Sequence, residues 1–198
     1  MKRLSRAESR EMTRQRLRSA ASEEVATRGV SGASIDRIAE TAGFSRGAFY
    51  ANYRTKQDLM IELLEESVAA EVAMLQDLLG QASDLQDFLP LMEASFNRFI
   101  AQRERRLLSM QLMIEAEADP AFGAIYREHS ARIVEAIEPL ILELLTKSPN
   151  PRRLSAEMVG ITFRTLVLGL VMESHRGNVQ ADKTPGAILT QILETLLC

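Results

Sequence analysis

The sequence is poor in the residues that cross-linking and most catalysis require. Of its 198 residues only Cys198 is a cysteine, so no disulfide can form within the chain, which fits a reducing compartment. The two histidines, His129 and His175, are too isolated to predict a metal site. No Ser/His/Asp or Cys/His set and no glycine-rich phosphate loop stands out. These absences argue against an enzyme, and we expect no cofactor and no metal.

Long apolar runs are missing as well. No segment reaches the ~18 uninterrupted apolar residues that are needed to cross a bilayer. The first residues, Met1 to Glu8, lack the apolar stretch of a signal peptide. With 46% hydrophobic and 26% charged residues, the composition is that of an ordinary globular protein. We therefore expect a cytoplasmic protein that does not associate with membranes.

The charges are distributed unevenly along the chain. Residues 1–56 hold 12 Lys and Arg against 6 Asp and Glu, which gives this segment a net charge of +6. Residues 57–198 hold 12 against 21, a net charge of −9, and the two sums give −3 for the whole chain. Lys and Arg displace counterions from phosphates, so the basic segment indicates a polyanion partner. A solvated charged helix explains the charge pattern equally well.

Almost the whole chain shows helical periodicity. Proline is scarce, four of the six prolines stand at the boundaries of the segments, and alternating β-patterns are absent. We predict an all-α protein with about nine helices. Gly29 and Gly43 should end the first and second helices, and Pro139 should bend the seventh. The predicted helices cover about residues 8–28, 35–42, 46–52, 56–79, 85–102, 104–118, 122–145, 154–173 and 185–197.

The stretch from Ser34 to Lys56 has the pattern of a helix-turn-helix. Serine is a favoured N-cap residue, and Ser34 and Ser45 precede the two short helices. Gly43 supplies the left-handed turn between them. The second helix is too short and too polar to be a core element by itself. Its exposed residues are an arginine, Arg46, the small residues Gly47 and Ala48, a tyrosine, Tyr50, and an asparagine, Asn52.

These residue types suit a surface that binds DNA. Arg46 and Asn52 can read base edges, while Tyr50 and Lys56 reach phosphates. Small residues let the backbone approach the duplex, and helix N-termini can point amide hydrogens at phosphate oxygens. The predicted DNA-binding residues are Ser34, Ser45, Arg46, Gly47, Ala48, Tyr50, Asn52 and Lys56. Two further aromatic residues, Phe49 and Tyr53, should hold the helix predicted at residues 46–52 onto the helices predicted at residues 8–28 and 56–79.

The same stretch resembles the N-terminal signature of the tetracycline-repressor family. That signature has an Ala-rich first helix ending in Gly, then Thr/Ser, Ile-Ala, Ala-Gly-Val-Ser, Gly, Tyr, an aromatic residue and Lys. The match covers about residues 10–62, and the rest of the chain matches in length and helical character. The residues that carry it are Ala20, Ala21, Gly29, Ser34, Ile38, Ala39, Ala42, Gly43, Ser45, Gly47, Tyr50, Tyr53, Lys56 and Leu59.

Four positions depart from the family pattern. Val25 stands where the family usually has phenylalanine, and Phe44 replaces the usual valine, changes that repacking should accommodate. Ala51 and Asn52 occupy positions where the family often carries a larger or aromatic residue and a histidine. These two residues put in question one phosphate contact that the family makes. They also leave base readout at this end of the helix unassigned.

The resemblance implies two parts with different tasks. Residues 1–56 would form an N-terminal three-helix helix-turn-helix DNA-binding domain, and residues 57–198 a C-terminal helical ligand-binding and dimerisation domain. A homodimer would form through residues 154–173 and 185–197, which offer more apolar surface than one small subunit needs. Such a dimer would engage double-stranded DNA at two half-sites of a palindromic operator.

The resemblance also implies a small-molecule effector. The candidate pocket consists of apolar and aromatic side chains and one carboxylate. The carboxylate would favour a cationic ligand if it faces inward, and a solvated face is the alternative for it. Met and aromatic side chains suit adaptable pockets, but ordinary core packing is the alternative for any single one of them. The candidates are Met92, Phe96, Phe99, Met110, Met113, Glu117, Phe122, Tyr126, Phe163 and Met172.

The predicted function is that of a dimeric, sequence-specific transcriptional regulator, a repressor that a small apolar or amphipathic ligand releases. The alternative is a DNA-binding regulator without a small-molecule effector, with the same N-terminal helices and a filled body. The arginine-rich start, Arg3 to Arg18, leaves two outcomes open. It contacts the DNA backbone or the minor groove, or it frays and touches nothing.

Overall fold

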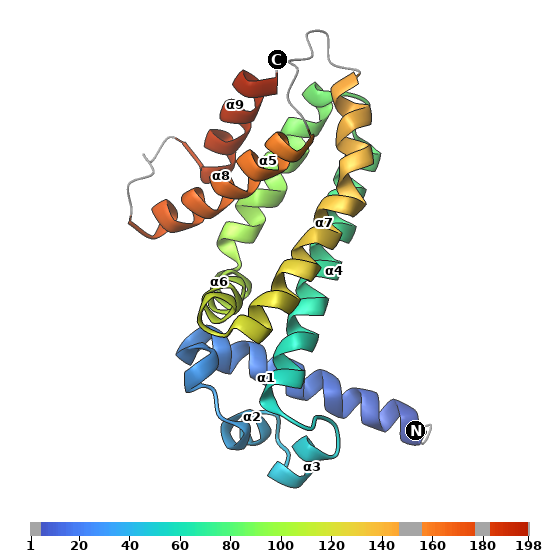
Figure 1. The fold of residues 1–198 in the computed structure, drawn as a ribbon, viewed down its shortest axis with the longest axis vertical. Helices are drawn as coiled ribbons and strands as arrows, with labels where there is room; N and C mark the ends of the chain where they lie inside the picture. The colour runs from blue at the N-terminus through green and yellow to red at the C-terminus, as the bar shows by residue number, and fades with distance from the viewer. Residues whose placement is uncertain (1–4, 147–155, 177–182, 198) are drawn as a thin grey trace. The chain divides into compact units, whose positions relative to one another are not determined.

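The structure is a computed structural model that describes residues 5–146, 156–176 and 183–197 (Figure 1). Within these ranges every regular element is an α-helix, and the all-α prediction is confirmed. Each predicted helix is found, and its ends differ from the prediction by a few residues. The helices are α1 (Arg6–Gly32), α2 (Ile35–Thr41), α3 (Arg46–Tyr50), α4 (Lys56–Gln81), α5 (Leu85–Ala101), α6 (Arg103–Ala118), α7 (Pro120–Thr146), α8 (Ala156–Arg176) and α9 (Pro185–Leu197).

The two glycines that were predicted to end helices behave differently. Gly43 ends α2 as predicted, with a φ of 75°, and the Phe44 amide donates to the Ala39 carbonyl at 2.8 Å. Gly29 also has a φ of 75°, but the helix resumes after it and continues to Gly32. The prediction that the first helix ends at Gly29 is therefore half right, because the helix is interrupted there but a further turn follows. The glycine makes a kink, because a single left-handed residue interrupts the helix without preventing another turn.

The chain folds into two compact units. The first, here called the N-terminal unit, comprises Met1–Val68 and Glu104–His129. The second, the C-terminal unit, comprises Ala69–Arg103 and Ser130–Cys198. Helices α4 and α7 thus contribute one part to each unit. The predicted domain boundary after residue 56 concerns where DNA binding ends, and it stays a prediction.

The core of the N-terminal unit is one cluster of buried apolar side chains. They come from α1 to α4, α6 and α7, and burial of such surface contributes about 25 cal/mol per Å². Val25, one of the departures from the family pattern, is fully buried there, and Phe44 packs against the cluster. The cluster comprises Leu17, Ala20, Ala21, Val25, Val30, Ala33, Ile38, Ala39, Ala42, Phe49, Tyr53, Leu59, Met60, Leu63, Leu64, Leu108, Leu112 and Phe122.

In the C-terminal unit α9 packs against α5 and α8 (Figure 1). Asn97 on α5 holds the start of α9: its Nδ2 donates to Thr184 Oγ1 at 3.0 Å, and its Oδ1 accepts from the Gly186 amide at 2.9 Å. A Cβ at Gly186 would lie 2.6 Å from the Glu93 carbonyl oxygen. The close approach of the two helices therefore requires glycine at this position.

Some predictions fall where the structure tests them little or not at all. Pro139 lies inside α7, and the predicted bend there stays a prediction. Leu154, at the start of the predicted eighth helix, and Cys198 lie outside the described residues. In the three described segments, no helix combines the length and the apolarity that a membrane crossing requires.

Candidate nucleic-acid interface

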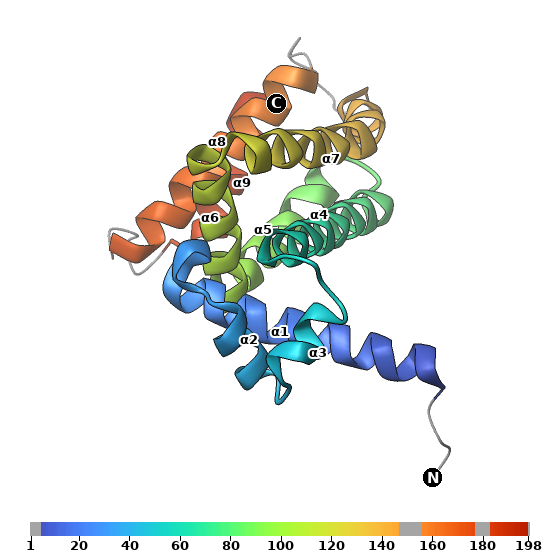
Figure 2. The same cartoon turned by 60° about the horizontal axis from the view of Figure 1, so that its bottom comes forward.

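Helices α2 and α3 form the predicted pair beside α1 (Figure 2). Both N-caps are confirmed: Ser34 Oγ accepts from the Arg37 amide at 3.3 Å, and Ser45 Oγ accepts from the Ala48 amide at 3.2 Å. These bonds satisfy amides that would otherwise lack a helical partner, and they set where each short helix begins. The turn between the helices is closed by Gly43, as the sequence predicts.

One face of α3 is anchored in the core. Phe49 is fully buried and Tyr53, just beyond the helix, is 4% exposed, with their ring centroids 5.6 Å apart. The predicted packing role of both aromatic residues is confirmed. Because a five-residue helix is unstable alone, this anchor must determine how α3 lies on the unit.

The other face of α3 points outward. Arg46 and Tyr50 are exposed, and so is Gly47. A Cβ added at Gly47 would meet no atom closer than Ser45 Oγ, at 3.6 Å, so the packing within the chain does not require glycine there. The missing side chain instead leaves room outside the protein. Ala48, half-buried, completes this compact surface.

Arg46 is held by neighbours on two helices. Its NH1 donates to both carboxylate oxygens of Asp36 at 3.2 Å, and its NH2 donates to the Tyr50 hydroxyl at 3.4 Å. The guanidinium carbon lies 5.6 Å from the centre of the Tyr50 ring. The Tyr50 hydrogen bond and the Asp36 carboxylate raise the pKa of Arg46. The residue is therefore a permanent cation on this surface.

Two of the predicted DNA contacts have partners within the chain. Asn52 Nδ2 donates to the Ala48 carbonyl at 2.8 Å, which folds the amide back onto α3. Lys56 Nζ donates to the carbonyls of Val30 at 2.7 Å and Ala33 at 3.1 Å, at the end of α1. A cation at this position suits the negative end of a helix. The structure thus gives both side chains an internal role, and their contacts with DNA stay predictions.

The start of α4 is closed by a capping box that the sequence analysis missed. Asp58 Oδ2 accepts from the amides of Arg54 at 3.1 Å and Thr55 at 3.0 Å, and the Asp58 amide donates to Thr55 Oγ1 at 3.1 Å. These three amides are therefore already bonded within the chain. The spacing Thr-x-x-Asp at residues 55–58 was the readable signal.

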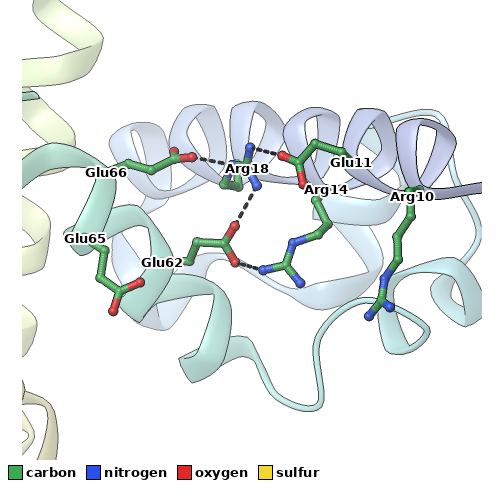
Figure 3. A pocket seen from close by; sticks show the side chains of 8 residues that line it. Arg10, Glu11, Arg14, Arg18, Glu62, Glu65 and Glu66 are labelled. Carbon is green, nitrogen blue, oxygen red and sulfur yellow. Dashed lines mark hydrogen bonds and ion pairs between the residues drawn. The ribbon is translucent and has the colours of Figure 1, made fainter. Parts of the chain in front are cut away.

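A cluster of charged side chains joins α1 to α4, here called the α1–α4 cluster: Glu11, Arg14, Arg18, Glu62 and Glu66 (Figure 3). Arg18 contacts Glu62 and Glu66 at 2.6 Å each and Glu11 at 2.9 Å. Although burial opposes it, the three carboxylates raise the pKa of Arg18. The cluster was not predicted, although the sequence carries its signal, two arginines and two glutamates each spaced by four residues.

Arg14 connects this cluster to the end of α3. It pairs with Glu62, and its NH1 donates to the Asn52 carbonyl at 3.4 Å. Its guanidinium carbon lies 4.8 Å from the centre of the Tyr53 ring. One arginine of α1 thus contacts both the residues that follow α3 and the first turns of α4.

The start of α1 is ordered helix from Arg6 onward. Ser5 and Glu8 form a capping box, with the Ser5 amide donating to Glu8 Oε2 at 2.6 Å. The alternative of a frayed start is therefore wrong for residues 6–18. Arg14 and Arg18 are engaged in the cluster, while Arg6 and Arg10 are exposed. The contact of these exposed arginines with DNA stays a prediction, and Arg3 lies outside the described residues.

The predicted pocket residues are divided between the two units. In the N-terminal unit Phe122 is fully buried in the core and Tyr126 packs against it, whereas Glu117 is exposed. Met110 and Met113 are half-buried. The core-packing alternative thus describes Phe122 better than a pocket wall does.

In the C-terminal unit the remaining five candidates also differ in burial. Met92 and Phe96 are buried, and Phe99 stacks on Phe96 with ring centroids 6.3 Å apart. Phe163 is half-buried, whereas Met172 is 39% exposed. The apolar pocket stays a prediction for both groups. The hollow drawn in Figure 3 is of another kind, because charged residues of α1 and α4 line it.

Among the described residues, no group of three or more His, Cys, Asp and Glu side chains is arranged to hold a metal ion. Residues 17–63 match the model of the family described as bacterial regulatory proteins, tetR family. This segment contains α2, α3 and two residues of the α1–α4 cluster, Arg18 and Glu62. A comparison with curated proteins finds no match to this sequence.

Several solved structures share the fold. The fatty acid degradation regulator FadR of Bacillus halodurans is 17% identical, with a TM-score of 0.77 over 98% of this chain and 96% of its own. FadR of Bacillus subtilis in complex with stearoyl-CoA is 16% identical, with a TM-score of 0.76 over 92% and 97%. A Saccharomonospora viridis protein described as a transcriptional regulator, in complex with choline, is 19% identical, with a TM-score of 0.69 over 92% and 94%.

Proposed function

The chain belongs to the tetR family of bacterial regulatory proteins by its residues 17–63, and from this premise we propose that it is a dimeric, sequence-specific transcriptional repressor that a small apolar or amphipathic ligand releases. The observation that carries the proposal is the geometry of α3. Phe49 anchors the helix in the core, while Arg46, Gly47 and Tyr50 face outward. A short helix fixed in this way presents its N-terminal half to a groove of DNA.

The division of labour follows the predicted domains. Residues 1–56 bind DNA, and residues 57–198 bind the effector and the second subunit. Arg46 and Ala48 face bases, while Tyr50 and the capped helix starts at Ser34 and Ser45 face phosphates. Because α4 begins beside the recognition helix and contacts Arg14, a change in its direction would move the reading surface. The repressor acts in the cytoplasm, where its DNA is.

The homodimer is supported by an apolar stripe on α8. Its members lie at helical spacing on one face and are 39–54% exposed: Met158, Ile161, Leu168 and Met172. A row of exposed apolar side chains on one helix marks an interaction surface. A second copy of the same stripe is the partner that two-fold symmetry supplies. With α9 beside α8, the proposed interface covers residues 154–173 and 185–197.

The ligand class is argued from the relatives and from the chain's own side chains. The structural neighbours include a regulator in complex with stearoyl-CoA and another in complex with choline. In this chain the Met and aromatic candidates suit an apolar tail. The ligand must bind one conformation better than the other, and a shift from 1:99 to 99:1 takes ~5.5 kcal/mol of differential binding.

A regulator without a small-molecule effector is the second candidate. It is favoured by the burial of Phe122, Met92 and Phe96, which are packed as core residues. A titration separates the two candidates. Release of bound operator by stearoyl-CoA or choline supports the first candidate, and equal operator affinity across a panel of amphipathic and cationic ligands supports the second.

The DNA-binding function is tested by selection from a random double-stranded library. The expected result is an enriched palindrome with two half-sites about one helical turn apart. Sedimentation of the wild type and of Leu168→Glu should show a dimer and a weakened dimer. A library that shows no enrichment would refute sequence-specific binding, and a wild-type monomer would refute the two-fold model.

A further inference from the structure

Arg46 and Asp36 form a pair that lies on the proposed reading surface. Arg46 is the first residue of α3, and Asp36 lies in the first turn of α2. Their side chains are 59% and 64% exposed, and both carboxylate oxygens accept from NH1. An exposed ion pair of this kind contributes little to folding stability. Its placement on the first turns of the two helices that face DNA therefore calls for another explanation.

The pair restricts where the Arg46 guanidinium can point. Asp36 holds NH1 from α2, while the Tyr50 hydroxyl and ring hold NH2 and one face of the group from α3. A long arginine side chain otherwise samples many rotamers. The N–H donors not engaged by these neighbours stay available for a ligand. A guanidinium fixed in this way is prepared for a planar acceptor with two adjacent sites.

The carboxylate has a second effect because of its charge. Asp36 is an exposed anion on a surface that is proposed to approach a polyphosphate. It repels every DNA sequence alike, and only a sequence that contacts Arg46 well compensates for that repulsion. Repulsion of this kind lowers non-specific binding and so increases specificity.

We propose that Asp36 is a specificity-determining residue that orients Arg46 for guanine, whose O6 and N7 form the planar acceptor pair. Asp36 acts through Arg46 and is a positioning residue. The inference rests on the proposed function, because it presupposes that α3 reads DNA. It extends that function by assigning a role to a residue of α2 and a base class to Arg46.

The test uses the whole chain and the operator selected by the wild type. Base preference is measured by competition among operators that vary one position of the half-site. Asp36→Asn should lower the preference for guanine at one position about tenfold and tighten binding to random DNA, because a negative charge is removed. Thermal melting should be unchanged, since the pair is exposed.

Glu40 provides the matched control. It is an exposed acidic residue on the same helix α2. Glu40→Gln removes the same charge and should tighten binding to random DNA, but it should leave the base preference unchanged. Asp36→Glu retains the charge and the ability to accept from Arg46, so it should recover part of the guanine preference. In an Arg46→Ala background, Asp36→Asn should have no further effect on base preference.

The possible failures are distinguishable. If Arg46→Ala abolishes a base preference that Asp36→Asn leaves intact, the positioning role is overturned while the proposed function stands. If Glu40→Gln changes the preference as strongly as Asp36→Asn does, the effect is one of general charge and the role is again overturned. If Arg46→Ala leaves all preferences unchanged, Arg46 is no reader and the inference fails. If the wild type selects no sequence, the proposed function fails as well.

Discussion

Arg18 of α1 and Arg46 of α3 belong to the same basic segment, yet their surroundings are opposite. The side chain of Arg18 is 13% exposed and contacts three glutamates, whereas that of Arg46 is 59% exposed and contacts Asp36. A net charge of +6 in residues 1–56 therefore overstates the charge available to DNA. Some of these cations hold helices together, and others lie on the surface. Three experiments test whether an arginine or lysine of this segment is structural or available at the surface, and a fourth concerns the buried Tyr53 beside Arg14.

The largest effect is expected from Glu62→Ala. Its side chain is 17% exposed and pairs with both Arg14 and Arg18, so the substitution leaves two partly buried cations without this partner. We expect a loss of about 3 kcal/mol in the free energy of unfolding, measured by urea denaturation. Glu65→Ala, on the same helix but with a 55% exposed side chain, is the control and should cost far less. Equal losses would show that the cluster is an ordinary solvated face.

Lys56→Met is expected to have the next largest effect. The substitution keeps the apolar stem but removes the donor to two carbonyls at the end of α1. Because hydrogen bonds from charged groups contribute more than neutral ones, unfolding should become about 2 kcal/mol easier. Binding to all DNA sequences should weaken together, as measured by fluorescence anisotropy. Weaker binding with unchanged stability would place Lys56 with Arg46 among the surface cations.

Arg46→Ala should change recognition and leave stability alone. We expect a loss of about 1–3 kcal/mol in the discrimination of one base position, because a direct base contact is removed. Urea denaturation should give the wild-type midpoint, since the side chain is exposed and only its surface pair is lost. A lowered midpoint would show that Arg46, like Arg18, is mainly a structural cation.

The smallest effect concerns pH. Burial and the nearby Glu62 carboxylate raise the pKa of Tyr53 to about 12, from an ordinary value of 10.0. The folded state therefore holds this proton more tightly than the unfolded state does. The contribution of Tyr53 to the free energy of unfolding is fully present below pH 10 and is lost as the pH rises towards 12. At pH 11 the loss should be about 1 kcal/mol. Tyr53→Phe should remove this part of the pH dependence, and an identical slope in the variant would contradict the assignment.

How much the sequence revealed depended on how local each feature is. The caps at Ser34 and Ser45 and the turn at Gly43 involve residues within a few positions of each other, and all three were predicted. Gly29 was only half predicted, because the pattern shows a break but not that another helical turn follows. The capping box at residues 55–58 was equally local and was overlooked.

The internal roles of Arg14, Arg18 and Lys56 are different in kind. Glu11 lies seven positions from Arg18, but the other hydrogen-bond partners of these residues lie 23–48 positions away. Composition and periodicity show that an arginine is present on a helix but not which carboxylate faces it after packing. For the same reason the burial of Phe122 in the N-terminal core was not separable from a pocket wall. The partners and the burial of these side chains became known only from the packed structure.

The hydrogen bonds between Asn97 and the start of α9 have a consequence for folding during synthesis. The two partners, Asn97 and Thr184, are 87 residues apart, and α5 leaves the ribosome long before α9 does. At about 5–20 residues per second, α5, which carries the buried side chains of Phe88 and Met92, waits roughly 5–20 s for α9 to pack against it. During that interval the nascent chain exposes apolar side chains of α5. Chaperone binding during translation should therefore concentrate on this stretch.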